Sequence, residues 1–237
     1  MAGTGFSVSL VVPAYNEADG IAAAAEEALE ALAGFARAFE VLVVDDGSRD
    51  GTAAAVEALA RTRPGLRLLR HPRNRGYGAA LRTGFAAARF DRVAFTDADA
   101  QFDARDLGRL VSLTGQFPLV VGYRLARQDP WKRRFLSWGY NRLVRTLLGT
   151  RVRDCDCALK VFRRDALEKL MPESDNFFVN TEMLSRAARL GLPVAEVGVR
   201  HRPRRHGASK VSLGDVPRTL RTLLPFWWRH ALAARRG

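Results

Sequence analysis

The stretch VLVVDDGSRDGT at residues 41–52 decides how the first half of the chain folds. It opens with the apolar run Val41–Val44, and an apolar run of this length without polar alternation is typical of a strand buried on both faces. Two acidic residues follow, and Gly47 permits a tight turn. Asp50 is placed to cap the helix that the alanine-rich segment Thr52–Ala60 predicts.

The same succession of a short apolar run and a helix-forming segment repeats on either side. The predicted strands are Val8–Val12, Val41–Val44, Leu66–Leu69, Val93–Phe95 and Leu119–Val121, and the predicted helices are Ile21–Leu32, Thr52–Ala60, Ala79–Ala88 and Ala104–Leu113. Strands alternating with helices predict an α/β fold, in which a mostly parallel sheet has helices on both sides. Ligands bind such sheets beyond the carboxyl ends of the strands. The polar segments Pro13–Glu17, Asp45–Asp50 and Asp97–Gln101 fall at those ends, so we expect the functional site there.

The second half of the chain has a less regular pattern. Trp131–Leu148 has the length of a helix, but its apolar residues do not form one stripe. Val194–Val199 is predicted to be a further strand, and the basic run Arg200–His206 follows it.

Length and composition fit one large globular domain. The chain has 237 residues, and a 47% share of hydrophobic residues argues against intrinsic disorder. Its two cysteines, Cys155 and Cys157, are two residues apart and would point to opposite faces of an extended segment, so we expect no disulfide and a reducing compartment. We also expect no secretory signal and no transmembrane helix, because no apolar run of about 18 residues occurs.

The net charge of +13 is unevenly distributed. Residues 1–123 carry 13 Lys and Arg against 15 Asp and Glu, whereas residues 124–164 carry 12 against 3 and residues 200–237 carry 10 against 1. Such an excess indicates an anionic partner: nucleic acid, anionic lipid or a phosphorylated substrate. The alternative is an arginine-rich genome, although that bias would also enrich the first half.

Asp97 and Asp99 form a pair of carboxylates after a predicted strand. Strand alternation would direct both to one side, where they repel each other unless a proton or cation lies between them. Mg²⁺ or Mn²⁺ would satisfy this pair and bridge to diphosphate oxygens, with Gln101 as a neutral third ligand. The alternative is a turn of helix-capping aspartates.

Asp45 and Asp46 form a second carboxylate pair, at the end of the strand Val41–Val44. A carboxylate at this place can accept hydrogen bonds from a nucleobase or a ribose hydroxyl. On its own, the pair is equally compatible with a capped turn.

Together, these motifs resemble glycosyltransferase family 2, in the branch of the dolichol-phosphate mannose synthases and polyprenyl-phosphate glucosyltransferases. The resemblance extends from Val8 to Lys210. Its motifs, in order, are VPAYNE at 12–17, VVDDGSRDGT at 43–52, NRGYGAA at 74–80, DADAQ at 97–101, DCDCALKVFRR at 154–164 and RPRRHGASK at 202–210.

This resemblance implies a GT-A fold, an inverting reaction and a division of the site residues into groups. Nucleotide contacts are implied for Pro13, Tyr15, Glu17, Asp45, Asp46 and Asp97, and binding of the metal and diphosphate is implied for Asp97, Asp99 and Gln101. Contacts to the acceptor phosphate or the leaving diphosphate are implied for Arg124, Arg204, Ser209 and Lys210. A catalytic role is implied for Asp99 and Asp154. The implied donor is GDP-mannose or UDP-glucose, and the implied acceptor is a polyprenyl phosphate.

Asp154 has the position of a candidate base, but the acceptor chemistry leaves its role open. A phosphate monoester has its second pKa near ~6 and is largely dianionic at neutral pH, so it needs little deprotonation. Asp154 could equally orient a sugar hydroxyl or stabilise the cationic sugar of the transition state.

The sequence departs from the family pattern at three places. Tyr77 stands where many relatives have lysine, Ala158 replaces a frequent glycine, and no pair of transmembrane helices follows up to Gly237. These departures affect, in turn, the loop before a predicted helix, the acceptor pocket and the means of membrane attachment.

The C-terminal tail of the sequence suggests how the protein binds to a membrane. We divide the chain into a GT-A domain (1–210) and a tail (211–237), whose apolar residues recur at helical spacing. Pro217 and Pro225 each suit a first helical turn, which predicts two short helices. Aromatic residues beside arginine at 226–229 are typical of an interfacial anchor at the cytoplasmic face. The alternative is packing on the domain, on a second copy of the chain or on a membrane-protein partner.

Three other functions are less consistent with the sequence. A nucleotidyltransferase would have a glycine-rich basic loop after the first strand, whereas Pro13–Glu17 is acidic and lacks glycine. A nucleic-acid binder would explain the charge, but not carboxylates gathered at strand ends. A family 2 enzyme with a soluble hydroxyl acceptor would need Asp154 as a true base.

Overall fold

Seven strands form one sheet in the part of the chain that the computed structural model describes, residues 5–125, 131–203 and 221–228 (the backbone alone at 131–136). The sheet order is β3-β2-β1-β4-β6-β5-β7. The strands are β1 (Ser7–Ala14), β2 (Ala38–Asp45), β3 (Leu66–Arg70), β4 (Arg92–Phe95), β5 (Leu119–Leu125), β6 (Lys160–Arg163) and β7 (Val194–Arg200).

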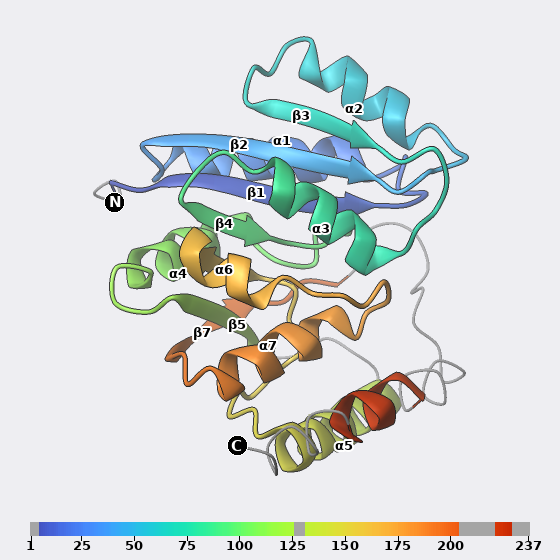
Figure 1. The fold of residues 1–237 in the computed structure, drawn as a ribbon. Coiled ribbons are helices and arrows are strands. Elements are labelled where there is room, and N and C mark those ends of the chain that lie inside the picture. Colours follow the sequence, from blue (N-terminus) through green and yellow to red (C-terminus); the bar gives the residue numbers. More distant parts are fainter. Residues whose placement is uncertain (1–4, 126–130, 204–220, 229–237) are drawn as a thin grey trace.

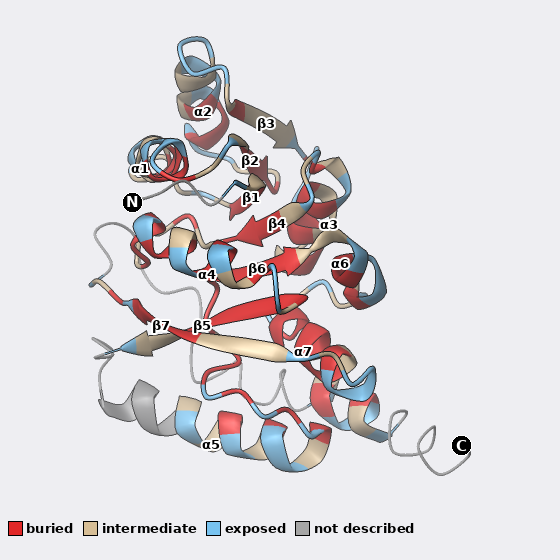
Figure 2. Cartoon of the chain, turned by 90° about the vertical axis from the view of Figure 1, so that its left-hand side faces the viewer, coloured by how far each residue is buried: buried red, intermediate tan, exposed pale blue. Residues whose placement is uncertain are grey.

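Helices cover both faces of this sheet (Figures 1 and 2). They are α1 (Ile21–Ala33), α2 (Thr52–Ala60), α3 (Tyr77–Ala87), α4 (Leu107–Leu113), α5 (Trp131–Leu148), α6 (Arg164–Leu170) and α7 (Val179–Arg189), with a 3₁₀ turn η1 (Ala104–Asp106) before α4. α1 and α4 lie on one face, and α3, α6 and α7 lie on the other (Figure 2). The predicted mostly parallel α/β architecture is therefore confirmed.

β6 is the exception to the parallel arrangement, and the sequence analysis missed it. It pairs antiparallel with β4 on one side and with β5 on the other. Because β6 runs in the opposite direction, the segment that precedes it lies at the carboxyl edge of its parallel neighbours. This reversal brings residues 154–159 to the edge of the sheet where the loops after β1, β2 and β4 also lie.

The core fills the space between the sheet and its helices. The central strands are buried on both faces, as the continuous apolar runs predicted, and Val8, Leu10, Val41 and Val43 have no exposed surface. Phe85 of α3 meets Phe95 of β4 edge to face, with ring centroids 5.9 Å apart. This packing holds the loops at the carboxyl edge on a rigid support.

The described part of the tail is a helix over residues 221–228. Phe226 packs edge to face on Phe178, with ring centroids 5.0 Å apart, and Leu223 is fully buried. Trp228, in contrast, is 60% exposed. One side of this helix is therefore attached to the domain, and a large aromatic side chain remains on its surface.

The predicted helix start at Pro225 is wrong. Residues 221–228 are helical without a break, so Pro225 has at least one helical turn before it. The other proposed start, Pro217, lies outside the described residues. No helix of the described part has both the length and the apolarity needed to cross a membrane.

Candidate active site

The three predicted polar segments meet residues 154–159 at one edge of the sheet. The strand pairing places the end of β1 beside the end of β2, with Ala14 opposite Asp45, and the end of β4 beside β1, with Phe95 opposite Val11. The loops after these strands contain Tyr15–Glu17, Asp45–Asp50 and Asp97–Gln101, and residues 154–159 join them through β6. The predicted convergence is confirmed for the three segments that follow β1, β2 and β4.

The loops after β1 and β2 are joined by hydrogen bonds between side chains and backbone. Ser48 Oγ accepts from the Asn16 amide at 2.9 Å, and Asn16 Oδ1 accepts from the Arg49 amide at 2.9 Å. Thr52 Oγ1 accepts from the Glu17 amide at 2.9 Å. Asn16 has a φ of 51°, a left-handed conformation that asparagine adopts more readily than most other residues besides glycine. The two loops are thus fixed relative to each other before any ligand binds.

Asp45 is fully buried at the end of β2. Its Oδ1 accepts from the Ser48 amide at 3.0 Å. Its Oδ2 lies 3.6 Å from Arg70 Nε and accepts no hydrogen bond from the described residues. A buried acceptor without a donor is costly, so this oxygen is suited to a ligand N–H or hydroxyl group.

Asp46 makes different contacts from those of Asp45. Its Oδ1 lies 2.6 Å from His71 Nδ1 and accepts from the Arg75 amide at 2.9 Å, and its Oδ2 accepts from the Gly76 amide at 2.8 Å. The implied contact of Asp46 with the nucleotide stays a prediction. In this arrangement, the carboxylate fastens the loop between β3 and α3, so its observed contacts support the site indirectly.

His71 was missed by the sequence analysis. It is buried, and its Nε2 lies 2.9 Å from Thr83 Oγ1, so the imidazole links Asp46 to α3. No local pattern marks this histidine, because it follows the exposed Arg70 at the end of β3.

Asp97 and Asp99 lie in a turn after β4. The expectation that they alternate on a strand is wrong, since β4 ends at Phe95. Asp99 Oδ1 accepts from the Gln101 amide at 3.1 Å, and Ala100 has a φ of 53°. A left-handed alanine requires support from its surroundings, and it reverses the chain between the carboxylate and Gln101.

Asp97 receives a hydrogen bond from the other side of the site. Tyr77 Oη donates to Asp97 Oδ1 at 2.8 Å. Burial and the neighbouring Asp97 carboxylate raise the pKa of Tyr77 well above its usual value, so the phenol stays protonated and remains a donor.

The oxygen donors of this turn fit a divalent metal that also binds phosphate. Among the described residues, no three His, Cys, Asp or Glu side chains are grouped so that they could hold a metal ion by themselves. Asp97 and Asp99 could supply two carboxylates to such a metal, and substrate oxygens would have to complete the shell. Mg²⁺ is commonly held in this way, by one or two carboxylates together with substrate phosphates. Asp99 and Glu17 line the same small pocket against α1.

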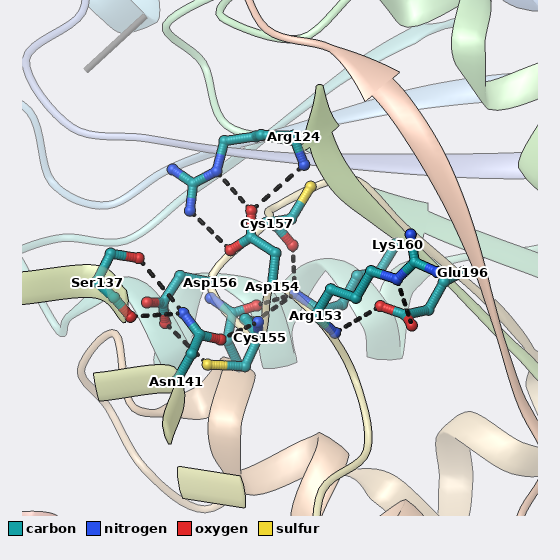
Figure 3. A network of polar contacts seen from close by, with 11 residues as sticks. Arg124, Ser137, Asn141, Arg153, Asp154, Cys155, Asp156, Cys157, Lys160 and Glu196 are labelled. Atoms are coloured by element: carbon teal, nitrogen blue, oxygen red, sulfur yellow. Dashed lines mark hydrogen bonds and ion pairs between the residues drawn. The ribbon is translucent and has the colours of Figure 1, made fainter. Parts of the chain in front are cut away.

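Asp154 and Arg124 form a buried ion pair (Figure 3). Arg124 Nε donates to Asp154 Oδ2 at 2.7 Å and Arg124 Nη2 donates to Asp154 Oδ1 at 2.8 Å, with each side chain 8% exposed. Burial opposes the charge of Arg124, but the Asp154 carboxylate raises the pKa of the guanidinium above its usual value. A two-point contact of this kind orients the carboxylate and holds it in the ionised form.

Lys160 lies beneath the Asp154 segment and was not among the predicted site residues. Its ammonium group has no exposed surface, and it donates to the carbonyl oxygens of Cys155 (3.1 Å) and Cys157 and to Asn180 Oδ1 (2.8 Å). Burial lowers the pKa of Lys160. One feature of the sequence could have indicated this buried lysine: Lys160 stands among apolar residues at the start of β6.

Cys155 and Cys157 are both buried and unbonded to each other, as predicted. Burial raises the pKa of Cys157 to about 12, and it raises the pKa of Cys155 well above its usual value. We therefore expect both thiols of the folded protein to resist iodoacetamide at neutral pH, since the thiolate is the reactive species. Mass spectrometry should detect two alkylated cysteines in urea and none in buffer; rapid alkylation in buffer would contradict this burial.

The segment after β7 is attached to the carboxylate turn. The Arg202 amide donates to the Gln101 carbonyl at 2.7 Å, and His201 forms an isolated antiparallel bridge with Phe102. The Arg202 guanidinium lies 2.7 Å from both Glu27 and Asp103. The predicted phosphate-binding residues Arg204, Ser209 and Lys210 follow this attachment directly, and they lie outside the described residues.

A family model for glycosyl transferase family 2 matches residues 9–171. The chain is 37% identical over 242 residues to glycosyltransferase AglD of Haloferax volcanii, an alignment that covers 98% of this chain and 38% of that protein. It is 32% identical over 237 residues to dodecaprenyl-phosphate galacturonate synthase of Rhizobium johnstonii, covering 97% of this chain and 69% of that protein. The chain thus spans well under half of the first relative and about two thirds of the second.

Among solved structures, the chain resembles glucosyl-3-phosphoglycerate synthase from Mycobacterium tuberculosis in complex with Mn²⁺, UDP and phosphoglyceric acid. The TM-score is 0.74 at 25% identity, over 94% of this chain and 79% of that one. This likeness agrees with the GT-A type of architecture that the motifs implied. With the ordered sequence motifs and the carboxylates gathered at one sheet edge, these matches establish that the chain belongs to glycosyl transferase family 2.

Proposed function

We propose that this protein transfers a hexose from a nucleoside-diphosphate sugar to a polyprenyl phosphate at the cytoplasmic face of a membrane, with the aid of Mg²⁺ or Mn²⁺. The observation that carries the proposal is the 32% identity, along 97% of the chain, to a relative named as a dodecaprenyl-phosphate galacturonate synthase. The excess of positive charge in the second half of the chain suits an acceptor that is itself an anion.

The donor would lie across the ends of β1, β2 and β4. Asp45 presents a buried oxygen to the nucleoside, beside Pro13, Tyr15 and Glu17 in the neighbouring loop. Asp97, Asp99 and Gln101 would hold the divalent metal. When bound, that metal supplies positive charge to the diphosphate and stabilises it as a leaving group.

The acceptor phosphate would arrive from the side of β5 and β7. Arg204, Ser209 and Lys210 would bind it, because they follow the point at which Arg202 attaches this segment to the carboxylate turn. An oxygen of the phosphate attacks the anomeric carbon from the face opposite the diphosphate. The new C–O bond forms while the bond to the diphosphate breaks, and the nucleoside diphosphate leaves with the electron pair, so the configuration inverts.

Asp154 would act on the sugar rather than on the acceptor proton. A phosphate dianion has no proton to give up, and the two-point contact with Arg124 opposes protonation of Asp154. The carboxylate would therefore orient a sugar hydroxyl or stabilise positive charge on the sugar ring in the transition state. Arg124, rather than meeting the acceptor by itself, keeps Asp154 in place and adds positive charge near the phosphates.

Membrane association would rest on the tail helix and on α5. Trp228 and Leu224 of the 221–228 helix are 60% and 51% exposed, and Trp138 of α5 is 55% exposed. Tryptophan beside arginine is typical of the headgroup region of a bilayer. The opposite side of the helix is attached to the domain through Phe226, which would keep the site near the surface that carries the lipid.

A radiolabel transfer assay tests the proposal. Purified protein with Mn²⁺ or Mg²⁺ receives a short-chain polyprenyl phosphate and, in turn, labelled GDP-mannose and UDP-glucose. We expect label to enter the organic phase with one of the two donors and to be lost with EDTA. Omission of the lipid provides the background rate of donor hydrolysis.

Phosphoglyceric acid serves as the competing acceptor, because a structurally similar enzyme was solved with it. Label that enters a water-soluble product, and never the lipid, would replace the proposed acceptor with a soluble one. The hydroxyl group of such an acceptor has to lose its proton, so Asp154 would then be required as a base. The rate of sugar transfer should in that case depend on the protonation state of Asp154. An absence of both transfer and donor hydrolysis with every combination would count against the proposed reaction.

A further inference from the structure

Tyr77 contacts the proposed metal site from the start of α3, outside the turn that carries Asp97 and Asp99. It is the first residue of α3, and its hydroxyl group donates to Asp97 Oδ1 at 2.8 Å. A lysine at this position would bring a positive charge beside the same carboxylate. Tyrosine supplies a hydrogen bond without that charge, so the negative potential that attracts a divalent cation is retained.

The ring of Tyr77 is held in place by the segment between α6 and α7. It packs against Phe177, with ring centroids 4.9 Å apart. Gly78 donates its amide to the Asp175 carbonyl at 2.8 Å. A Cβ atom at Gly76 or at Gly78 would overlap the carbonyl oxygens of Asp175 or Ser174, so both glycines are needed for this close approach. The start of α3 is thus docked on residues 174–177.

That segment is itself fixed by buried and partly buried charges. Glu182 is 1% exposed, and its two oxygens accept from the amides of Glu173 (2.8 Å) and Ser174 (2.9 Å). Arg82 of α3 donates to the Ser174 carbonyl at 2.9 Å. A continuous set of contacts therefore runs from α7 through residues 173–177 to Tyr77 and ends at Asp97.

We propose that Tyr77 is a positioning residue that orients Asp97 for the divalent metal. The inference rests on the proposed function, since it assumes that Asp97 is a metal ligand. Hydrogen bonds to ligating carboxylates fix their orientation, and their loss typically lowers metal affinity about 10- to 100-fold.

The test compares Mn²⁺ binding by wild-type protein and Tyr77→Phe. Electron paramagnetic resonance reports free Mn²⁺ during titration in the presence of saturating UDP or GDP, whichever the wild type binds. We expect Tyr77→Phe to raise the Kd for Mn²⁺ about tenfold. The Kd for the nucleotide in EDTA should stay within about twofold, because the change acts on the metal ligand and leaves the nucleoside contacts intact.

Tyr140→Phe is the matched control. It also removes a phenol that is hydrogen-bonded, to Thr181 Oγ1 at 2.7 Å, but on α5 and away from Asp97. Its Mn²⁺ affinity should equal that of the wild type. Phe177→Ala is a second variant, at a half-exposed position: it keeps the hydroxyl group and removes the ring that holds it, and we expect a loss of about threefold in Mn²⁺ affinity.

Unchanged or tighter Mn²⁺ binding by folded Tyr77→Phe would overturn the inference and leave the proposed function intact. The same holds if Tyr140→Phe loses as much affinity as Tyr77→Phe. Failure of the wild type to bind Mn²⁺ with either nucleotide would instead remove the metal premise of the proposed function. The two failures are therefore distinguishable in one set of titrations.

Discussion

Replacement of Asp99 by alanine is expected to lower sugar transfer at least about a hundredfold. Asp99 is one of only two carboxylates that the turn after β4 offers to a metal, and no third His, Cys, Asp or Glu completes a group in the described part of the chain. Loss of preorganised charge at a leaving group typically costs about 10²- to 10³-fold in rate. The measurement is label transferred per minute at saturating donor and metal.

The fold should tolerate this change. Asp99 is partly exposed, and its hydrogen bond to the Gln101 amide contributes about 1 kcal/mol to the free energy of unfolding in urea. Asp91→Ala is the matched control, since Asp91 is an exposed aspartate at the opposite end of β4, and it should keep wild-type transfer. Transfer by Asp99→Ala at close to the wild-type rate would remove the metal assignment of this turn.

Arg124→Met should cost about 3–5 kcal/mol of unfolding free energy as well as most of the activity. The change leaves the Asp154 carboxyl group buried and without the guanidinium that binds both of its oxygens. Urea denaturation followed by circular dichroism measures the stability, and the transfer assay at a temperature where the variant is folded measures the activity. Unaltered stability would mean that Arg124 acts on the substrate alone.

The double variant Arg124→Met with Asp154→Leu separates the two roles of the pair. Replacing both charged partners by apolar side chains of similar size often restores stability, because neither charge is then buried unpaired. We expect the double variant to regain most of the lost unfolding free energy and to remain inactive. Arg67→Met provides a comparison: it breaks another ion pair, with Glu40 at 2.7 Å, away from the site, and should reduce stability without reducing transfer by the folded protein.

The first half of the fold could be predicted from the sequence because local signals agree there. Buried parallel strands appear as continuous apolar runs, and alanine-rich segments between turn residues have helical propensity. The structure places β1 to β5 within a few residues of the predicted strands. The convergence of Asp45 and Asp97 at one edge also follows, because the carboxyl ends of parallel strands meet there.

The remaining features depend on contacts between segments that are far apart in the sequence, and local sequence patterns do not report such contacts. β6 has only four residues and ends directly at α6, so it lacked the turn residues that mark a strand. The turn that contains Asp97 and Asp99 could not be predicted, because the left-handed Ala100 has no signature in the sequence. The role of Asp46 was also unpredictable, since its partner His71 lies 25 residues away.

The position of β6 has a consequence for how the chain folds. β3, β2, β1 and β4 form one parallel group, β5 and β7 form another, and β6 is the strand that joins them. A chain in the course of synthesis completes the first group early, from strands and helices that are neighbours in sequence. The second group cannot attach until β6 has been made and inserted between β4 and β5. Asp154, in the segment that precedes β6, can therefore join the loops after β1, β2 and β4 only once β6 has been inserted.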